Sequence, residues 1–146
     1  MGERVVELNI PFFDPEPNIS EPTLVQSERA CYLIYWDREM NRKALEFYRC
    51  SITKFGYPND DALAGHRLYG KGLDFYGVFE VFESEWIAEL RKCNQVRFPD
   101  VKVFEDGRHF IFAFHDSTFE CIATDFQPVS EFPGLDPKLL KLDESL

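Results

Sequence analysis

Apolar residues fall in short runs along the chain, separated by polar and proline-containing stretches. The run from Ala30 to Trp36 is continuously apolar, which is typical of a strand covered on both faces. Residues from Arg4 to Phe12 alternate loosely and predict an edge strand, and the β-formers from Tyr76 to Phe82 predict another strand. The segment from Ala44 to Phe55 fits a strand or a helix. Its β-formers favour one long strand that pairs with the preceding run as a hairpin.

The segment from Glu85 to Val96 carries its apolar residues at helical spacing. Trp86, Ile87 and Leu90 recur on one side of the helical wheel, and charged residues occupy other positions. Ser84 stands directly before the segment, where its side-chain oxygen can cap the helix. The pattern therefore predicts one main helix that packs its apolar side against a sheet.

The clearest local pattern is a pair of strands that meet at Asp116-Ser117. If these two residues form the turn, Phe114 lies opposite Phe119 and Phe112 lies opposite Cys121. The large side chains then share one unbroken apolar face. A slip of the register by one residue would move every side chain to the other face.

Two stretches lack a regular pattern. Prolines interrupt residues 11–24, which we expect to form a surface loop, and prolines and a glycine keep the C-terminal segment 126–146 irregular. A chain of 146 residues, 45% of them hydrophobic, is long enough for one sizeable core. We therefore expect a single domain over residues 1–146, of the α+β class. Its mostly antiparallel sheet has five to six strands, with the main helix packed on one face.

The chain is acidic, with 26 acidic and 16 basic residues and a formal net charge of −10. No stretch gathers the lysines and arginines that neutralise phosphates, so nucleic acid and anionic membranes are poor partners. No apolar run approaches the length of a membrane span, and charges interrupt the first apolar run, unlike a signal peptide. These features predict a cytoplasmic protein. Its charge favours a basic protein or a cation as partner, although the same charge also serves solubility.

The sequence predicts no metal site and no cofactor. Three of the four cysteines lie in predicted strands among large apolar neighbours, which is typical of free thiols in a reducing compartment. His109 and His115 stand six residues apart on one predicted strand, roughly 20 Å, which is too far to share a metal ion. The widely separated cysteines are Cys31, Cys50, Cys93 and Cys121.

The fragment from Gly65 to Gly72 matches most of a phosphate-binding P-loop. Gly72 stands where that motif has Ser or Thr, and the fragment follows a polar stretch rather than a buried strand. We therefore interpret it as a tight glycine-rich turn.

Three polar residues are the candidate catalytic groups, namely His66, His115 and Glu120. In the expected register His115 shares a face with Thr118 and, diagonally, with Glu120, and a carboxylate beside an imidazole can orient it as a general base. His115 also fits a strand end that only makes turn hydrogen bonds. His66 lies in a long loop, where functional residues often occur, although the acidic residues before it also fit a turn and a helix cap. As solvated site residues, His115 and Glu120 should tolerate alanine at a cost of about 1 kcal/mol or less.

Three segments, Phe55 to Leu73, Ser84 to Asn94 and Arg108 to Ala123, resemble segments of small uncharacterised bacterial proteins. The resemblance spans roughly the central half of the chain. It implies a bacterial cytosolic protein and singles out the loop that carries His66 and the hairpin that carries His115. It implies no activity, no catalytic residue and no cofactor.

Two functions follow as hypotheses. The first is an acidic protein-binding module without enzymatic activity, immunity-like or regulatory, that acts on a basic protein. The second is a small hydrolase or ligand-binding enzyme in which His66, His115 and Glu120 converge around a pocket. The two differ in whether the His66 loop folds over the His115 end of the hairpin and brings these three side chains together.

Overall fold

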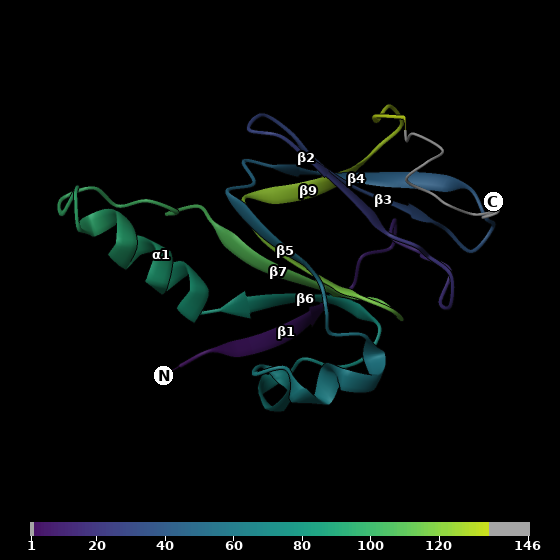
Figure 1. The fold of residues 1–146 in the computed structure, drawn as a ribbon, viewed down its shortest axis with the longest axis horizontal. Helices are drawn as coiled ribbons and strands as arrows, with labels where there is room; N and C mark the ends of the chain where they lie inside the picture. Colours follow the sequence, from purple (N-terminus) through teal and green to yellow (C-terminus); the bar gives the residue numbers. More distant parts are fainter. Residues whose placement is uncertain (1, 135–146) are drawn as a thin grey trace.

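The computed structural model describes residues 2–134, and these residues form nine strands and one α-helix (Figure 1). The strands are β1 (Arg4–Leu8), β2 (Thr23–Gln26), β3 (Cys31–Trp36), β4 (Arg42–Tyr48), β5 (Ile52–Gly56), β6 (Gly77–Phe82), β7 (Arg108–Ala113), β8 (Thr118–Ala123) and β9 (Asp125–Val129). The helix α1 spans Glu85–Gln95, and the 3-10 turns η1 (Asp60–Gly65) and η2 (Tyr69–Lys71) lie between β5 and β6. None of the described helices has the length and apolarity that a membrane crossing requires.

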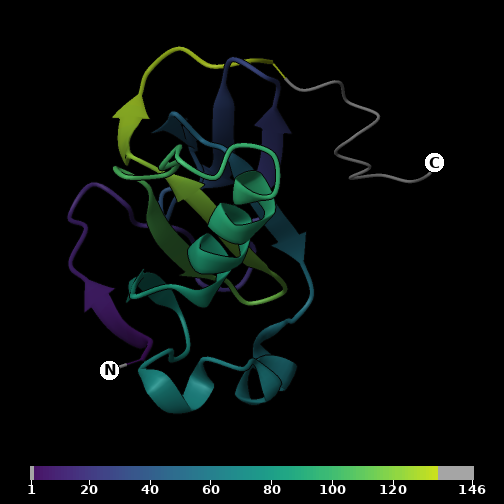
Figure 2. The ribbon, with the colours of Figure 1, turned by 90° about the vertical axis from the view of Figure 1, so that its left-hand side faces the viewer.

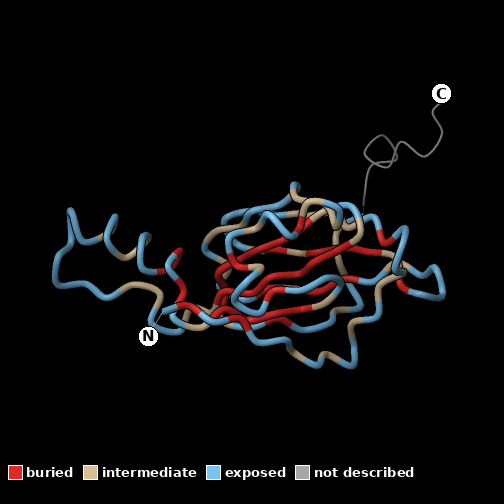
Figure 3. The backbone as a smooth tube through the Cα atoms, turned by 90° about the horizontal axis from the view of Figure 1, so that it is seen from below, coloured by how far each residue is buried: buried red, intermediate tan, exposed pale blue. Residues whose placement is uncertain are grey.

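The strands form two antiparallel sheets. The five-stranded sheet has the order β1-β6-β7-β8-β5, and the four-stranded sheet has the order β2-β3-β4-β9. Aromatic and aliphatic side chains of both sheets form one buried cluster between them, and Figure 3 shows the buried strands at the centre of the molecule. The α+β class and the antiparallel pairing are confirmed. The expectation of one sheet of five to six strands is wrong, because the strands divide between two sheets.

The division into two sheets arises partly between residues 44 and 55, where we expected one long strand. β4 ends at Tyr48 and β5 begins at Ile52 in the other sheet. Arg49 between them has a φ of 51°, a left-handed backbone conformation that interrupts a pleated strand. The chain therefore crosses from one sheet to the other here, although pairing of β3 with β4 is as expected.

A second crossing follows β8 and corrects the expectation for residues 126–146. The strand β9 continues almost directly from β8, pairs with β4 and buries Phe126 in the core. Pro128 is tolerated there because β9 is an edge strand. The part of this segment from residue 135 onward lies outside the described residues. Of the expected loop 11–24, the last two residues already belong to β2.

The hairpin of β7 and β8 keeps its expected faces but has another register. Phe110 lies opposite Cys121 and Phe112 lies opposite Phe119, because residues 114–117 form a turn of four residues instead of two. A shift of the pairing by two residues leaves every side chain on its expected face. The expected apolar face is therefore confirmed, and all of its members lie in the core between the sheets: Phe110, Phe112, Phe114, Phe119, Cys121 and Ala123.

The helix α1 begins as expected and packs on the outer face of the five-stranded sheet. The Ser84 side chain accepts a hydrogen bond from the Ile87 N–H at 3.2 Å. Trp86 and Ile87 are buried against Ile122 of β8, whereas Leu90 is only partly buried. Beyond the first turns, the helix and the loop after it extend away from the two sheets and are mostly exposed (Figure 3).

The segment with η1 and η2 covers another part of the same outer face, at the end of the molecule away from the four-stranded sheet (Figure 2). Its buried leucines are Leu63, Leu68 and Leu73. They pack against Phe79 and Ile111 of the sheet. Gly72 has a φ of 124°, and a Cβ at this position would collide with the Val5 carbonyl oxygen. The glycine of the P-loop-like fragment is thus required by close packing of the loop on β1.

Candidate functional site

Two buried polar side chains, His109 and Glu120, lie next to each other among apolar neighbours on the outer face of the five-stranded sheet. His109 lies opposite Ile122 and Glu120 lies opposite Ile111, so that His109 and Glu120 are diagonal neighbours on adjacent strands. His109 Nε2 is 2.8 Å from Glu120 Oε1. The His109 side chain is 0% exposed and the Glu120 side chain is 10% exposed. A buried carboxylate and a buried imidazole therefore satisfy each other within the sheet.

His66 reaches the same carboxylate from the covering loop. Its Nε2 lies 2.7 Å from Glu120 Oε2, and its Nδ1 lies 3.1 Å from the Leu68 backbone nitrogen. Because the Leu68 N–H donates to Nδ1, the imidazole proton of the neutral ring is on Nε2 and points at Glu120. The backbone of the loop thus fixes the tautomer of His66.

Ser84 extends these hydrogen bonds to the helix. Its Oγ lies 2.8 Å from His109 Nδ1 and also accepts the capping hydrogen bond from Ile87. The Ser84 hydroxyl can therefore donate to His109 Nδ1 while His109 donates its Nε2 proton to Glu120. Ser84, His109, Glu120 and His66 form a continuous hydrogen-bonded chain, which we call the polar network.

The polar network keeps Glu120 ionised. Burial raises the pKa of Glu120, but the hydrogen bonds from His109 and His66 outweigh it and lower the pKa to about 2. The ring of Trp86 covers His109 at a centroid distance of 5.1 Å, and the Lys54 ammonium lies 4.2 Å from the Trp86 ring centroid. The carboxylate is thus a permanent acceptor at neutral pH, in a site shielded by an aromatic ring.

The pKa of Glu120 predicts a loss of stability in acid. A carboxyl group whose pKa is lower in the folded than in the unfolded chain stabilises the fold above its unfolded pKa, near 4.5. This contribution, on the order of 3 kcal/mol, is lost as the pH falls from about 5 to about 2. We expect Glu120→Gln to show a correspondingly shallower pH dependence of the free energy of unfolding over this range. Denaturant titrations of both proteins at several pH values measure it, and parallel curves would contradict the prediction.

The polar network contains a serine, a histidine and a carboxylate, as a catalytic relay does. Its groups, however, are buried or nearly buried and use their hydrogen bonds on one another. A nucleophile needs a hydroxyl that faces its substrate. Ser84 is 8% exposed, and its oxygen already caps α1. Two cavities open among the described residues, one beside the loop that follows β1 and one between Arg67 and α1, and neither is lined by His66, His109 or Glu120. The arrangement therefore ties the loop, the helix and two strands together.

His115, the third candidate, does not join the polar network. The turn of four residues carries it beyond the end of β7, where its Nδ1 lies 2.8 Å from Asp116 Oδ1 and its Nε2 lies 3.7 Å from Asp60 Oδ2. The hydrogen bond with Asp116 and the nearby charge of Asp60 raise the pKa of His115. The loop does fold over this end of the hairpin, since the Asp60 N–H donates to the His115 carbonyl oxygen at 2.9 Å. The structure thus brings His66 and Glu120 together and places His109 where we expected His115.

An ionic group that sequence reasoning missed borders the polar network. The buried carboxylate of Glu3 accepts hydrogen bonds from both terminal nitrogens of Arg67, and from the Glu85 N–H at 2.8 Å. Lys71 Nζ lies 3.8 Å from the same carboxylate. These contacts join the N-terminal strand, the loop and the start of α1. Single charged residues far apart in the sequence gave no signal for this pairing.

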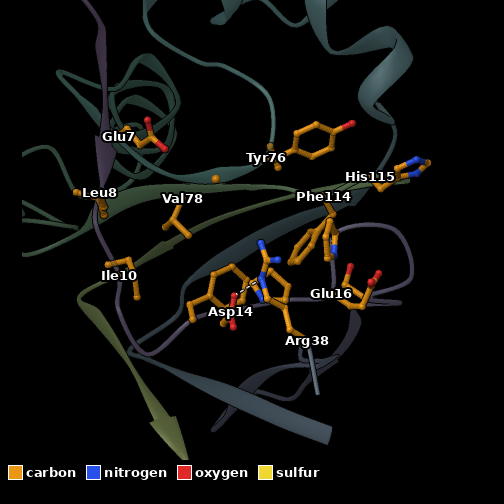
Figure 4. Close-up of a pocket in the computed structure, with 16 residues that line it drawn as sticks. Glu7, Leu8, Ile10, Asp14, Glu16, Arg38, Tyr76, Val78, Phe114 and His115 are labelled. Carbon is orange, nitrogen blue, oxygen red and sulfur yellow. Dashed lines mark hydrogen bonds and ion pairs between the residues drawn. The ribbon is translucent and has the colours of Figure 1, made fainter. Parts of the chain in front are cut away.

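A cavity of about 220 Å³ opens at the other end of β6 and β7, beside the loop that follows β1 (Figure 4). Its apolar wall includes Leu8, Ile10, Val78 and Phe114. Its charged rim includes Glu7, Asp14, Glu16, Arg38 and His115. We call it the acidic cavity.

Some of the charged side chains on the rim of the acidic cavity have hydrogen-bonding or ion-pairing partners among the described residues, and one does not. The Arg38 Nε donates to Asp14 Oδ1 at 2.6 Å. Glu16 Oε1 accepts hydrogen bonds from the Ile19 and Asn18 N–H groups, which lower the pKa of Glu16. Glu7, by contrast, has no hydrogen-bonding or ion-pairing partner among residues 2–134. Figure 4 shows the His115 ring pointing outward, so the cavity retains an excess of negative charge.

No protein-family model, no curated protein and no solved structure matches the chain. Within the described part of the chain, no group of three or more His, Cys, Asp or Glu residues is arranged to hold a metal ion.

Proposed function

We propose that this protein is a binding module without enzymatic activity, and that its acidic cavity receives a lysine or arginine side chain of a basic partner protein. The observation that carries the proposal is the carboxylate of Glu7, which has no partner among residues 2–134 and lies at the rim of a cavity with an apolar wall. An immunity-like or regulatory role, in which the module occupies a basic surface of its partner, agrees with this chemistry.

The two parts of the acidic cavity match the two parts of a long basic side chain. The methylene stem of lysine or arginine packs on apolar groups such as Leu8 and Phe114, while its charged end meets Glu7 or Glu16. The volume of about 220 Å³ is below the ~300–1,000 Å³ of typical small-molecule sites. One side chain of a partner therefore fits the cavity better than a whole metabolite does.

The net charge of −10 supports the same choice of partner. A strongly negative protein attracts a basic protein over long range and raises the rate of their encounter, in a way that salt weakens. Pairing at the cavity would then supply the specificity that net charge alone lacks.

We expect a synthetic peptide of alternating glycine and arginine to bind at the acidic cavity, and a peptide with citrulline in place of arginine not to bind. Citrulline has nearly the same shape as arginine but no charge. Removing one carboxylate that pairs with a guanidinium should weaken binding by about tenfold, and we expect this of Glu7→Gln. Titrations of nitrogen-15-labelled protein followed by NMR measure both the affinity and the residues affected.

Glu28→Gln is the matched control for this titration, since it removes the same charge from an exposed turn that does not line the acidic cavity. We expect it to change the affinity less than twofold, by screening alone. Equal weakening by Glu28→Gln and Glu7→Gln, or equal binding of the citrulline peptide, would show that only net charge is involved and would contradict the proposal.

A small hydrolase with a His/Glu site is the second candidate. The hydrogen bond of His66 to Glu120 supports it. The burial of His109 and the capping role of Ser84 argue against it, since neither group is placed to meet a substrate.

A further inference from the structure

Three of the four cysteines gather where the chain crosses between the sheets. Cys31 opens β3, Cys121 lies in β8, and Cys50 lies in the crossing between β4 and β5. Cys31 and Cys121 are buried in the core between the sheets. Cys50 packs against the same core but is partly exposed, whereas Cys93 is exposed on α1. Cys50 is therefore the member of the group that a solute can reach.

The strand register shows independently that these cysteines come together. Gln26 is paired with Cys31 and Thr53 is paired with Cys121, and directly paired residues share one face of a sheet. The Thr53 hydroxyl donates to Gln26 Oε1 at 2.7 Å, which joins the two pairs across the sheets. The Gln26 amide nitrogen lies 4.0 Å from the sulfur of Cys50, at the same junction.

The three thiols also influence one another's ionisation. The neighbouring Cys121 and Cys31 thiols lower the pKa of Cys50 against the effect of burial. Burial raises the pKa of Cys121, and the contact with Cys50 together with burial raises the pKa of Cys31. Cys50 is the partly exposed thiol of the group, and the thiolate is the nucleophilic form of cysteine, so Cys50 is the expected nucleophile and its two buried neighbours remain protonated.

We propose that Cys50 is a site of oxidation by hydroperoxides, which forms a disulfide with one of its two buried neighbours, Cys31 or Cys121. In the first step the Cys50 thiolate attacks a peroxide oxygen, the O–O bond breaks, and hydroxide leaves as Cys50 becomes a sulfenic acid. In the second step the neighbouring sulfur attacks the Cys50 sulfur, the S–O bond breaks, and water leaves. The water that leaves takes its proton from the neighbouring thiol, and the hydroxide of the first step is neutralised by the proton that Cys50 released when it ionised. Two thiols are thus oxidised by two electrons, and one hydrogen peroxide is reduced to two waters.

Cys31 and Cys121 differ in how easily their backbone can move to form a disulfide with Cys50. A disulfide needs the two Cα atoms within about 7 Å and a defined torsion, so a pair of reduced thiols adjusts slightly as it closes. Cys31 is the first residue of β3 and follows directly on the turn at residues 27–30, so its backbone is held less firmly than that of a residue within a paired strand. Cys121 lies within β8, which is paired on both sides. We therefore expect Cys31 to supply most of the disulfide.

Native protein with Cys93→Ser, treated with hydrogen peroxide and then unfolded and alkylated, tests the proposal. Trypsin separates the cysteines, because it cleaves after Arg29, Arg49 and Arg108 and after Lys54. We expect the intact mass before alkylation to fall by two hydrogen atoms, and the peptide Cys50–Lys54 to appear linked to the peptide that starts at Ala30 or to the one that starts at His109. Cys50→Ser in the same background should abolish the linkage. Since the readout on the Cys93→Ser protein does not depend on this variant, the test holds even if Cys50→Ser folds poorly.

The wild-type chain provides the internal control, because Cys93 is exposed and no contact of its sulfur with another thiol is found among the described residues. We expect Cys50 to lose its free thiol at least about tenfold faster than Cys93 under peroxide. Oxidation of Cys93 at an equal or higher rate would overturn the proposal. So would oxidation of Cys50 to sulfinic acid without a linked peptide, or a Cys50 that stays reduced.

Discussion

Glu120→Ala is expected to lower the free energy of unfolding by about 3 to 5 kcal/mol. The carboxylate accepts hydrogen bonds from His66 and His109 in a site that is almost closed to solvent. Its removal leaves two imidazole N–H groups without an acceptor, and unpaired buried donors are costly. The effect is much larger than the 1 kcal/mol or less expected if Glu120 were a solvated site residue. Chemical denaturation at neutral pH measures it.

Glu120→Gln is the matched control for the alanine variant. The Leu68 N–H holds the proton of His66 on Nε2, so the glutamine oxygen can accept from His66 as Glu120 does. The glutamine amide can then donate to His109, provided that the His109 proton moves to Nδ1 and is donated to Ser84. We therefore expect a cost of only about 1 to 2 kcal/mol for this variant. If alanine proves no more harmful than glutamine, the polar network does not hold the fold together.

Phe112→Ala is expected to destabilise the protein by about 3 to 5 kcal/mol, which approaches the whole stability of a marginal domain. The ring is 0% exposed and lies at the centre of the core. Its centroid is 5.2 Å from that of Phe13, 5.5 Å from that of Phe47 and 5.3 Å from that of Phe126. The cavity left by alanine would therefore remove contacts with three separate parts of the chain at once.

Phe98→Ala is the control for this substitution, because it deletes the same ring from an exposed position after α1. We expect its free energy of unfolding to change by about 0.5 kcal/mol or less. Urea denaturation of both variants compares them. Similar losses at the two positions would mean that the core between the sheets does not depend on the rings as described.

Glu120 and Phe112 both lie in the β7–β8 hairpin. The sequence predicted the buried position of Phe112 but not the hydrogen-bond partners of Glu120. The period of two along each strand places Phe112 in the core whether the turn has two or four residues, since the two registers differ by an even number. The partner of Glu120 depends on the turn length itself. With four residues in the turn, His109 rather than His115 lies diagonal to Glu120, and the candidate site changes.

The sequence by itself determined the features that depend on neighbours along the chain. These are the strand and helix periods, the Ser84 cap, the apolar face of the hairpin and the pairing of β3 with β4. Only the tertiary structure decided the two sheets, the polar network, the pairing of Glu3 with Arg67, the acidic cavity and the grouping of Cys50 with Cys31 and Cys121. The physical reason is that a side chain's face follows from local backbone geometry, whereas the residue opposite it follows from turn lengths and from crossings such as that at Arg49. The turn lengths and the crossings between sheets are fixed by packing between segments that lie far apart in the sequence.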